Sequence, residues 1–511
     1  VYGAELTAAL GTITVAAQDT SSIIADVKSA SIAATYAAAG SAISIGVSLA
    51  DATIGGNVRA AMRDSSVVAA KGLDILTTDN RYISVVSEAS SIAASNGFGG
   101  AMSGGGANAT ITDRGTREAL LTGNGTQSVN LIGAARVLLT SESRLEANIS
   151  SMSIAAGMFA VAASGAVAIV NAAGQFYARA EGVDVTASSL TVNATRLMSS
   201  QAMVRGLSVA TTMGVGASVA TVQISSDVRA FAGGAGATFT LGSLSVAARL
   251  AASSGRDLSD VQAYASGGGL LLGVQSTNAT SINRATVLSG LSGGTFSVTG
   301  ALAVTSDATG RQYARSRGIA GGLIGIGATD GTLSSLSTVN STVSANTTVS
   351  YAGSMQLAAA AVDENYLDIE AGAYGLASGA AAKGTTNANS SVFTGFLDGT
   401  SISNRALVRV AGTLTIAATY RAMPTGILTT SAFGAIAGSG ADITHNVGGR
   451  TQGRFGNYSD VMAGAIDGIV ANALNGSSFV DAKTGGLASG ASSTTNTNIN
   501  FTAEFIIGQN A

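Results

Sequence analysis

Only one histidine, His445, occurs among the 511 residues, and cysteine and tryptophan are absent. A nucleophilic triad needs a base next to its nucleophile, and no nucleophile-elbow motif lies near His445 in the segment ADITHNVGG. Zinc sites need several His or Cys ligands at short spacing, which this chain lacks. We therefore interpret His445 as an exposed or turn residue, and we predict no catalytic residue, no metal site and no cofactor.

The densest acidic group in the sequence is formed by Asp363, Glu364, Asp368 and Glu370. Paired carboxylates can cleave glycosidic bonds or bind calcium, and parallel β-helices can carry sites that act on polysaccharides. Tyr366 is the one aromatic residue within the group. We interpret the group as a solvated loop and keep a polysaccharide-active enzyme only as a remote alternative.

The composition limits the kind of core that the chain can build. Charged residues make up 11% of the chain, aromatic residues 5%, and there are 67 glycines and a single proline, Pro424. Proline removes a donor from a β ladder, so its near absence favours almost continuous β structure. A net charge of −3 gives no field suited to nucleic acid. These numbers predict a thin core of small, stacked side chains.

A short motif, apolar–any–apolar followed by small and polar residues, recurs about every 57 residues. Alternation within these motifs is typical of β-strands. Their first residues are Ile13, Leu73, Val137, Leu190, Leu244, Leu302, Met355 and Leu414.

This periodicity predicts an all-β fold, an elongated β-solenoid of about eight repeats, and it does not give the handedness of the coil. Each repeat divides into three coils of about 19 residues or two of about 28, and the sequence does not choose between them. The apolar stretch Ile154 to Gly174 is long enough to cross a bilayer, but similar Gly/Ala-rich stretches recur elsewhere. We therefore interpret it as buried strand and predict no transmembrane span.

The repeat fades after Asn446, so we expect a repetitive solenoid over residues 1–446 and a non-repetitive segment over 447–511. Apolar residues spaced three and four apart predict a helix over residues 459–474. A Gly/Ser/Thr/Asn-rich spacer over 485–498 is expected to be flexible. A strand is expected over 499–507, either exchanged with another subunit or folded back as a cap. Its alternating apolar residues are the predicted assembly residues: Ile499, Phe501, Ala503, Phe505 and Ile507.

The recurring strands, the Gly/Ala-rich runs and the lack of Cys and Pro resemble the passenger regions of giant repetitive bacterial surface proteins. These include filamentous-haemagglutinin-like adhesins and autotransporter passengers. The resemblance covers approximately residues 4 to 446. It rests on composition and repeat length and not on a specific motif, so no functional residue is carried over. It implies export, a right-handed β-helix and a role in adhesion or in an extracellular fibre.

From these observations we expect a non-enzymatic structural protein outside the cell or on its surface. It would form a filament or surface layer by stacking copies of itself head to tail. An adhesin that binds glycans or other surfaces is the alternative.

Overall fold

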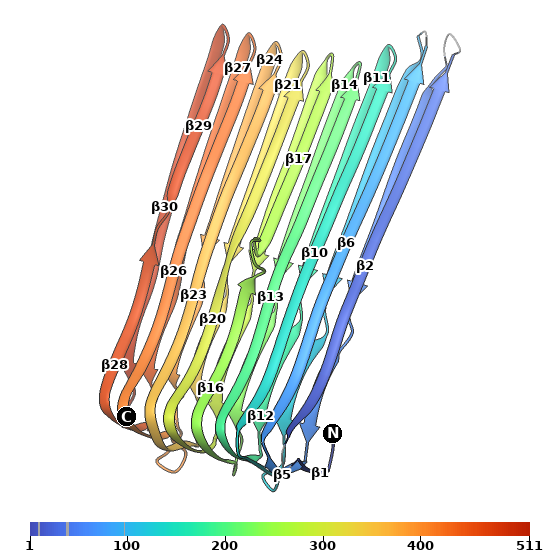
Figure 1. The fold of residues 1–511 in the computed structure, drawn as a ribbon. Coiled ribbons are helices and arrows are strands. Elements are labelled where there is room, and N and C mark those ends of the chain that lie inside the picture. The colour runs from blue at the N-terminus through green and yellow to red at the C-terminus, as the bar shows by residue number, and fades with distance from the viewer. Residues whose placement is uncertain (9–10, 37–39, 97) are drawn as a thin grey trace.

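The computed structural model describes residues 1–8, 11–36, 40–96 and 98–511. These residues form nine coils of a flattened β-solenoid, and within the described ranges every strand pairing is parallel apart from one isolated bridge. In each coil a long strand runs out to a tight turn, here called the tip, and the chain returns on the other side (Figure 1). The prediction of an all-β repeat solenoid is confirmed.

The outgoing strands belong to a 14-stranded sheet, here called sheet I. Its long strands are β2 (Thr12–Thr35), β6 (Gly72–Ser95), β10 (Ala134–Ala156), β13 (Asp184–Ala210), β16 (Thr238–Ala252), β17 (Ser259–Gly269), β20 (Gly294–Gly321), β23 (Thr347–Tyr374), β26 (Leu407–Phe433), β28 (Asp460–Leu474) and β29 (Ser477–Gly485). Its short corner strands are β1 (Glu5–Thr7), β5 (Ser66–Ala70) and β9 (Ser128–Leu131).

The returning strands form a 16-stranded sheet, here called sheet II. Those that follow the tips are β3 (Ala42–Ile54), β7 (Gly100–Asp113), β11 (Phe159–Ala172), β14 (Met213–Ile224), β18 (Leu272–Asn283), β21 (Ile324–Ser335), β24 (Ala377–Ala388), β27 (Ile436–Phe455) and β30 (Ala488–Ile507). Those nearer the opposite edge, here called the base, are β4 (Val58–Arg63), β8 (Thr116–Thr122), β12 (Gln175–Glu181), β15 (Asp227–Gly233), β19 (Thr286–Ser292), β22 (Thr338–Val343) and β25 (Ser391–Phe396).

Each sequence repeat makes one coil, so the expectation of two or three coils per repeat is wrong. The predicted anchor residues do stack directly on one another, as in the pairs Leu190–Leu244, Leu244–Leu302 and Met355–Leu414. A 28-residue strand is about 90 Å long, and nine coils stack to about 43 Å. The molecule is therefore a broad slab whose longest dimension follows the strands, so the expected elongation along the solenoid axis is wrong.

The interior differs between the tip half and the base half of each coil. Towards the base, large apolar side chains fill the space, and Phe239 and Phe296 stack with ring centroids 4.7 Å apart. Towards the tips the two sheets approach so closely that a Cβ on Gly216 would lie 2.3 Å from the carbonyl oxygen of Ser266. Most inward positions there are Gly, Ala or Ser, which explains the Gly/Ala-rich runs of the sequence, although Gln275 is buried at the register position next to Gly216.

Serine hydroxyls join the two sheets within the tip half of the first three coils. Ser44 donates to Ser31 at 3.1 Å, and Ser91 donates to Ser44 at 2.9 Å. Ser103 and Ser153 continue the series, each donating at 2.9 Å to the serine before it. Hydroxyl groups that would otherwise be buried without partners are satisfied across the interface.

The solenoid continues beyond residue 446. The helix expected over residues 459–474 is wrong, because these residues form strand β28 and pair with β26. Gly464 and Gly468 disfavour a helix in the middle of this segment, and the open edge of β26 offers its backbone a complete ladder. The expected flexible spacer is also wrong, because its residues 488–498 and the expected terminal strand together form β30, which pairs with β27 throughout.

Candidate functional site

Buried polar side chains form a line through the interior where the tip half meets the base half. This line, here called the polar belt, crosses the coils roughly at the middle of the long strands. Near the N-terminal end it contains the carboxylates of Asp79 and Asp113 and the guanidinium groups of Arg81, Arg117 and Arg196, all almost completely buried.

The ions of the N-terminal belt pair with one another. Arg117 donates to Asp79 at 2.8 Å and to Asp113 at 2.6 Å, and Arg196 donates to the other oxygen of Asp113 at 2.8 Å. Arg81 donates to Asp79 at 2.7 Å. Both Arg117 and Arg196 also lie over the ring of Phe176.

The pKa values of the N-terminal belt follow from burial and from these pairs. Burial alone would raise the pKa of Asp113, but the charges of Arg196, Arg117 and Arg81 outweigh it and hold that pKa below its ordinary value. Burial lowers the pKa of Arg196.

The C-terminal part of the belt has a carboxyl group without a cation. Asp363 is fully buried, and it accepts hydrogen bonds from Ser390 at 2.7 Å and from Tyr420 at 2.8 Å. Burial raises the pKa of Asp363 to about 6, although both hydroxyls act in the opposite direction. Burial also raises the pKa of Tyr420, with a further contribution from the charge of Asp363.

The structure separates the acidic group that the sequence suggested. All four residues lie in strand β23, so the expected solvated loop is wrong. Asp363 points inward, whereas Asp368 is on the outer face and pairs with Arg315 at 2.7 Å and Arg317 at 3.2 Å. Glu370 pairs with Arg317 at 3.5 Å. The geometry therefore does not bring these carboxylates together as a pair.

His445 is also placed differently from the prediction. It points inward from β27 and is buried, not exposed, and its Nε2 lies 2.7 Å from the hydroxyl of Ser478. Burial lowers the pKa of His445, so the neutral ring is favoured. Among the described residues no group of three or more His, Cys, Asp or Glu is placed to hold a metal ion.

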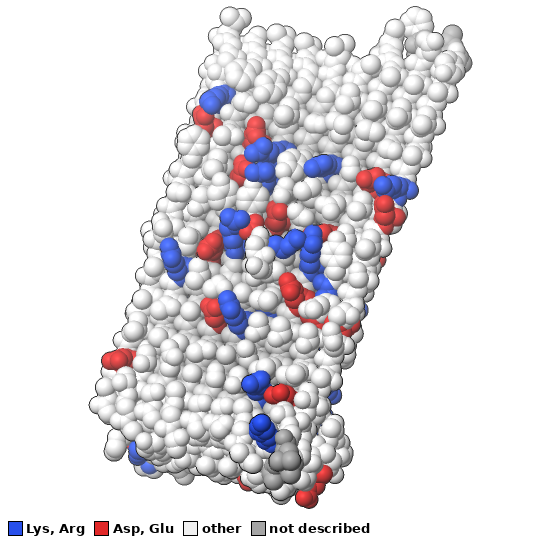
Figure 2. All heavy atoms as spheres, in the orientation of Figure 1, with Lys and Arg blue, Asp and Glu red and all other residues white. Residues whose placement is uncertain are grey.

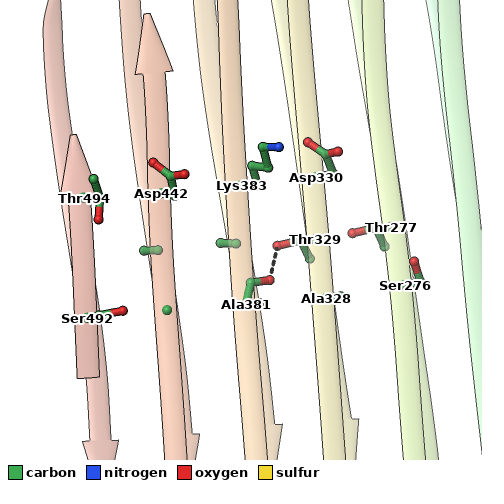
Figure 3. A pocket seen from close by; sticks show the side chains of 13 residues that line it. Ser276, Thr277, Ala328, Thr329, Asp330, Ala381, Lys383, Asp442, Ser492 and Thr494 are labelled. Atoms are coloured by element: carbon green, nitrogen blue, oxygen red, sulfur yellow. Dashed lines mark hydrogen bonds between the residues drawn. The ribbon is translucent and has the colours of Figure 1, made fainter. Parts of the chain in front are cut away.

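The outer faces carry shallow hollows. One hollow of about 450 Å³ lies on sheet II, where small residues such as Ala381 and Gly440 line its floor. Asp330, Lys383 and Asp442 stand in a row beside it, one from each of three neighbouring strands (Figure 3). In the view of Figure 2, many charged side chains lie across the middle of the strands and others lie nearer the base.

The two end coils have unpaired edges. At the C-terminal end, β30 pairs with β27 on one side, and among the described residues no strand pairs with its other side. At the N-terminal end, within the described ranges, β2 and β3 pair only with β6 and β7. Inward apolar residues of both coils are partly uncovered, including Ile13, Val15 and Ile23 of β2.

The predicted assembly residues lie at this open C-terminal end. Their register partners in β27 are residues 447, 449, 451, 453 and 455, which face the interior. Phe501 packs against the core and meets Tyr420 edge-on, at 5.9 Å between ring centroids. Ile499 and Ile507 are 59% and 70% exposed, because no coil covers them in the described structure.

The described residues contain no helix that could cross a membrane. A scan against known protein families and searches of curated proteins and of solved structures found no match.

Proposed function

We propose that this chain is a non-catalytic structural protein outside the cell that assembles end to end, one solenoid continuing the parallel ladder of the next. The observation that carries the proposal is the pair of open ends, each of which presents an unpaired long strand and uncovered interior side chains. Open strand edges readily accept another strand. A right-handed coil is the sense that parallel crossovers adopt, and we expect it here.

The contact would be head to tail. The C-terminal coil and the N-terminal coil present different surfaces of the same stack, so each copy can bind one neighbour at each end. Such heterologous contacts produce an open filament when the operation that relates the copies does not close into a ring. Partners for assembly are therefore further copies of the chain itself.

The direction of the backbone groups in β30 identifies which residues would pair with the next copy. The N–H of Ala488 donates to Ala435 at 2.9 Å and that of Gly508 donates to Phe455 at 2.8 Å, so even-numbered residues face β27. In a parallel sheet, successive residues of a strand direct their backbone N–H and C=O groups to the neighbouring strands on opposite sides. The N–H groups of odd-numbered residues, including Ala503, therefore point to the open edge.

Ala503→Pro tests the proposal, because proline removes one N–H from the open edge and leaves the ladder to β27 intact. We expect the wild-type protein to form elongated species whose size rises with concentration in sedimentation velocity. The Ala503→Pro variant should remain monomeric, with an unchanged far-ultraviolet circular dichroism spectrum.

Ala503→Ser, which keeps the N–H, is the matched control and should assemble like the wild type. A wild-type protein that stays single at every concentration would contradict the proposal, and so would an Ala503→Pro variant that polymerises normally.

Adhesion is the second candidate, and a hollow of about 620 Å³ on sheet I favours it. Arg205 and Arg317 stand on either side of Tyr264 along its polar wall, and Leu207 and Ile319 form its apolar wall. Guanidinium groups beside an aromatic ring and aliphatic side chains suit a glycan unit that presents both a charged group and an apolar face. Binding of oligosaccharides by single, unassembled molecules would support this candidate over assembly.

A further inference from the structure

Among the described residues, the tips of six coils present exposed large apolar side chains along one edge of the molecule, here called the rim. Leu270 is 76% exposed, Leu376 58% and Leu487 97%. Exposed apolar surface of this extent is uncommon in soluble domains and marks an interaction site. Six different coils contribute an exposed residue to the rim: Phe98, Phe159, Leu270, Leu323, Leu376 and Leu487.

Most turns of the rim and the strand residues beside them carry no charge, and the charged residue nearest in sequence to a rim residue is Lys483 of β29, four residues before Leu487. There is no Asp, Glu, Lys or Arg in residues 89–112, 206–226, 261–283 and 371–382, each of which spans one tip. The tip end of the molecule is correspondingly free of charged side chains in the view of Figure 2. The surface that binds to the rim must therefore itself be apolar.

The backbone of the rim is hydrogen-bonded from coil to coil. The N–H of Leu323 donates to the carbonyl of Leu270 at 2.8 Å, and that of Ala377 donates to the carbonyl of Leu323 at 3.0 Å. The N–H of Gly434 donates to Gly485 at 2.9 Å. A turn can enter a hydrocarbon environment only when its polar backbone groups are already satisfied, and these hydrogen bonds provide that condition for the turns of the interior coils.

We propose that the rim docks on a lipid bilayer, with the tip side chains inserted into the apolar part of the near leaflet. Interfacial segments enter lipid by about 5–10 Å, which corresponds to two or three strand residues on each side of the turn. Arg317 lies four residues before the end of β20, about 13 Å from the tip, and would remain at the depth of the headgroups.

The shape of the rim favours lipid over a second copy of the chain. Nine coils stack to about 43 Å, and near the tips the sheets lie closer than the usual separation of about 10 Å, so the edge covers less than about 430 Å². A stable protein interface buries about 800 Å² on each partner, so two rims placed together would fall short. A fluid bilayer can cover the flanks of the tips as well.

Flotation with phosphatidylcholine vesicles tests the proposal. We expect the wild-type protein to bind, and the variant Leu270→Asn/Leu323→Asn/Leu376→Asn to lose at least about a hundredfold in affinity, because burial of one leucine is worth about tenfold or more. The control variant Ile132→Asn/Leu397→Asn/Ile402→Asn removes exposed apolar residues away from the tips and should bind like the wild type.

Three results would overturn the proposal: a wild-type protein that does not float, a rim variant that still binds, or lipid-free rim-to-rim dimers that the rim variant abolishes. Leu323→Trp adds a direct readout, since the chain has no tryptophan of its own. Its emission should shift to the blue and be quenched by brominated lipid, whereas that of Ile402→Trp should not. The Ala503→Pro variant should still bind vesicles, so failure of end-to-end assembly is distinguishable from failure of lipid docking.

Discussion

The two ends of the polar belt stabilise buried carboxyl groups in different ways. In the N-terminal coils, buried carboxylates such as Asp113 are neutralised by guanidinium groups, among them those of Arg117 and Arg196. In the C-terminal coils, Asp363 is buried with only the hydroxyls of Ser390 and Tyr420. The first arrangement lowers the pKa of Asp113, while the second raises the pKa of Asp363 to about 6. The two parts of one solenoid should therefore respond to pH in opposite directions.

The direction in which stability changes with pH follows from the pKa of each carboxyl group. The pKa of Asp113 is lowered by its arginine partners, so its contribution to stability is present above about pH 4 and is lost as the pH falls through that lowered pKa. The pKa of Asp363 is raised to about 6, so its contribution is present below about pH 4 and is lost as the pH rises through 6.

Arg196→Ala should produce the largest effect on the N-terminal belt. It leaves one oxygen of Asp113 buried without its guanidinium partner, and loss of one member of a buried ion pair costs about 3–5 kcal/mol. Urea unfolding at pH 7, combined with hydrogen exchange of the strands from β6 to β13, would measure the change and its location. A cost below about 1 kcal/mol would show that the network is not a stabilising unit.

Asp363→Asn should have the next largest effect, with the opposite sign at neutral pH. The amide cannot ionise, so the variant should be more stable than the wild type at pH 7 by up to about 3 kcal/mol and about equal to it at pH 4. Denaturation profiles at the two pH values provide the test. Parallel pH profiles for wild type and variant would contradict a raised pKa at Asp363.

Tyr420→Phe should give the smallest effect, about 1–3 kcal/mol, because it removes one hydrogen bond to a buried carboxyl group. The loss should be greater at pH 7 than at pH 4, since the hydroxyl stabilises the ionised form of Asp363. Ser390→Ala removes the other donor and should show the same pH dependence. A loss that does not vary with pH would separate Tyr420 from the titration of Asp363.

The spacing of anchor residues such as Leu190, Leu244 and Leu302 was sufficient to predict the solenoid and its ladder. It could not give the number of coils per repeat, because strands of up to 28 residues are far longer than the usual length of about five or six. The polar belt could not be predicted from the sequence for another reason. Arg196 meets Asp113 only because strands of different coils are stacked, and no short motif records that contact.

The C-terminal segment shows how local pattern can mislead. Val461, Ile466 and Val470 are compatible with one face of a helix, but the tertiary ladder to β26 decides in favour of a strand. The predicted assembly residues lie where another coil could be added, which keeps assembly as a prediction for experiment. The rim had a visible signal in the uncharged stretch around each tip, but only the fold shows that these stretches share one edge.

Electron cryomicroscopy of the purified full chain tests the central claim most directly. End-to-end stacking predicts filaments about 90 Å wide in which copies repeat every 43 Å or so and the 4.8 Å spacing of the coils continues across each junction. Separate slabs of about 90 by 43 Å at every concentration, or assemblies in which the end coils remain free, would contradict the account.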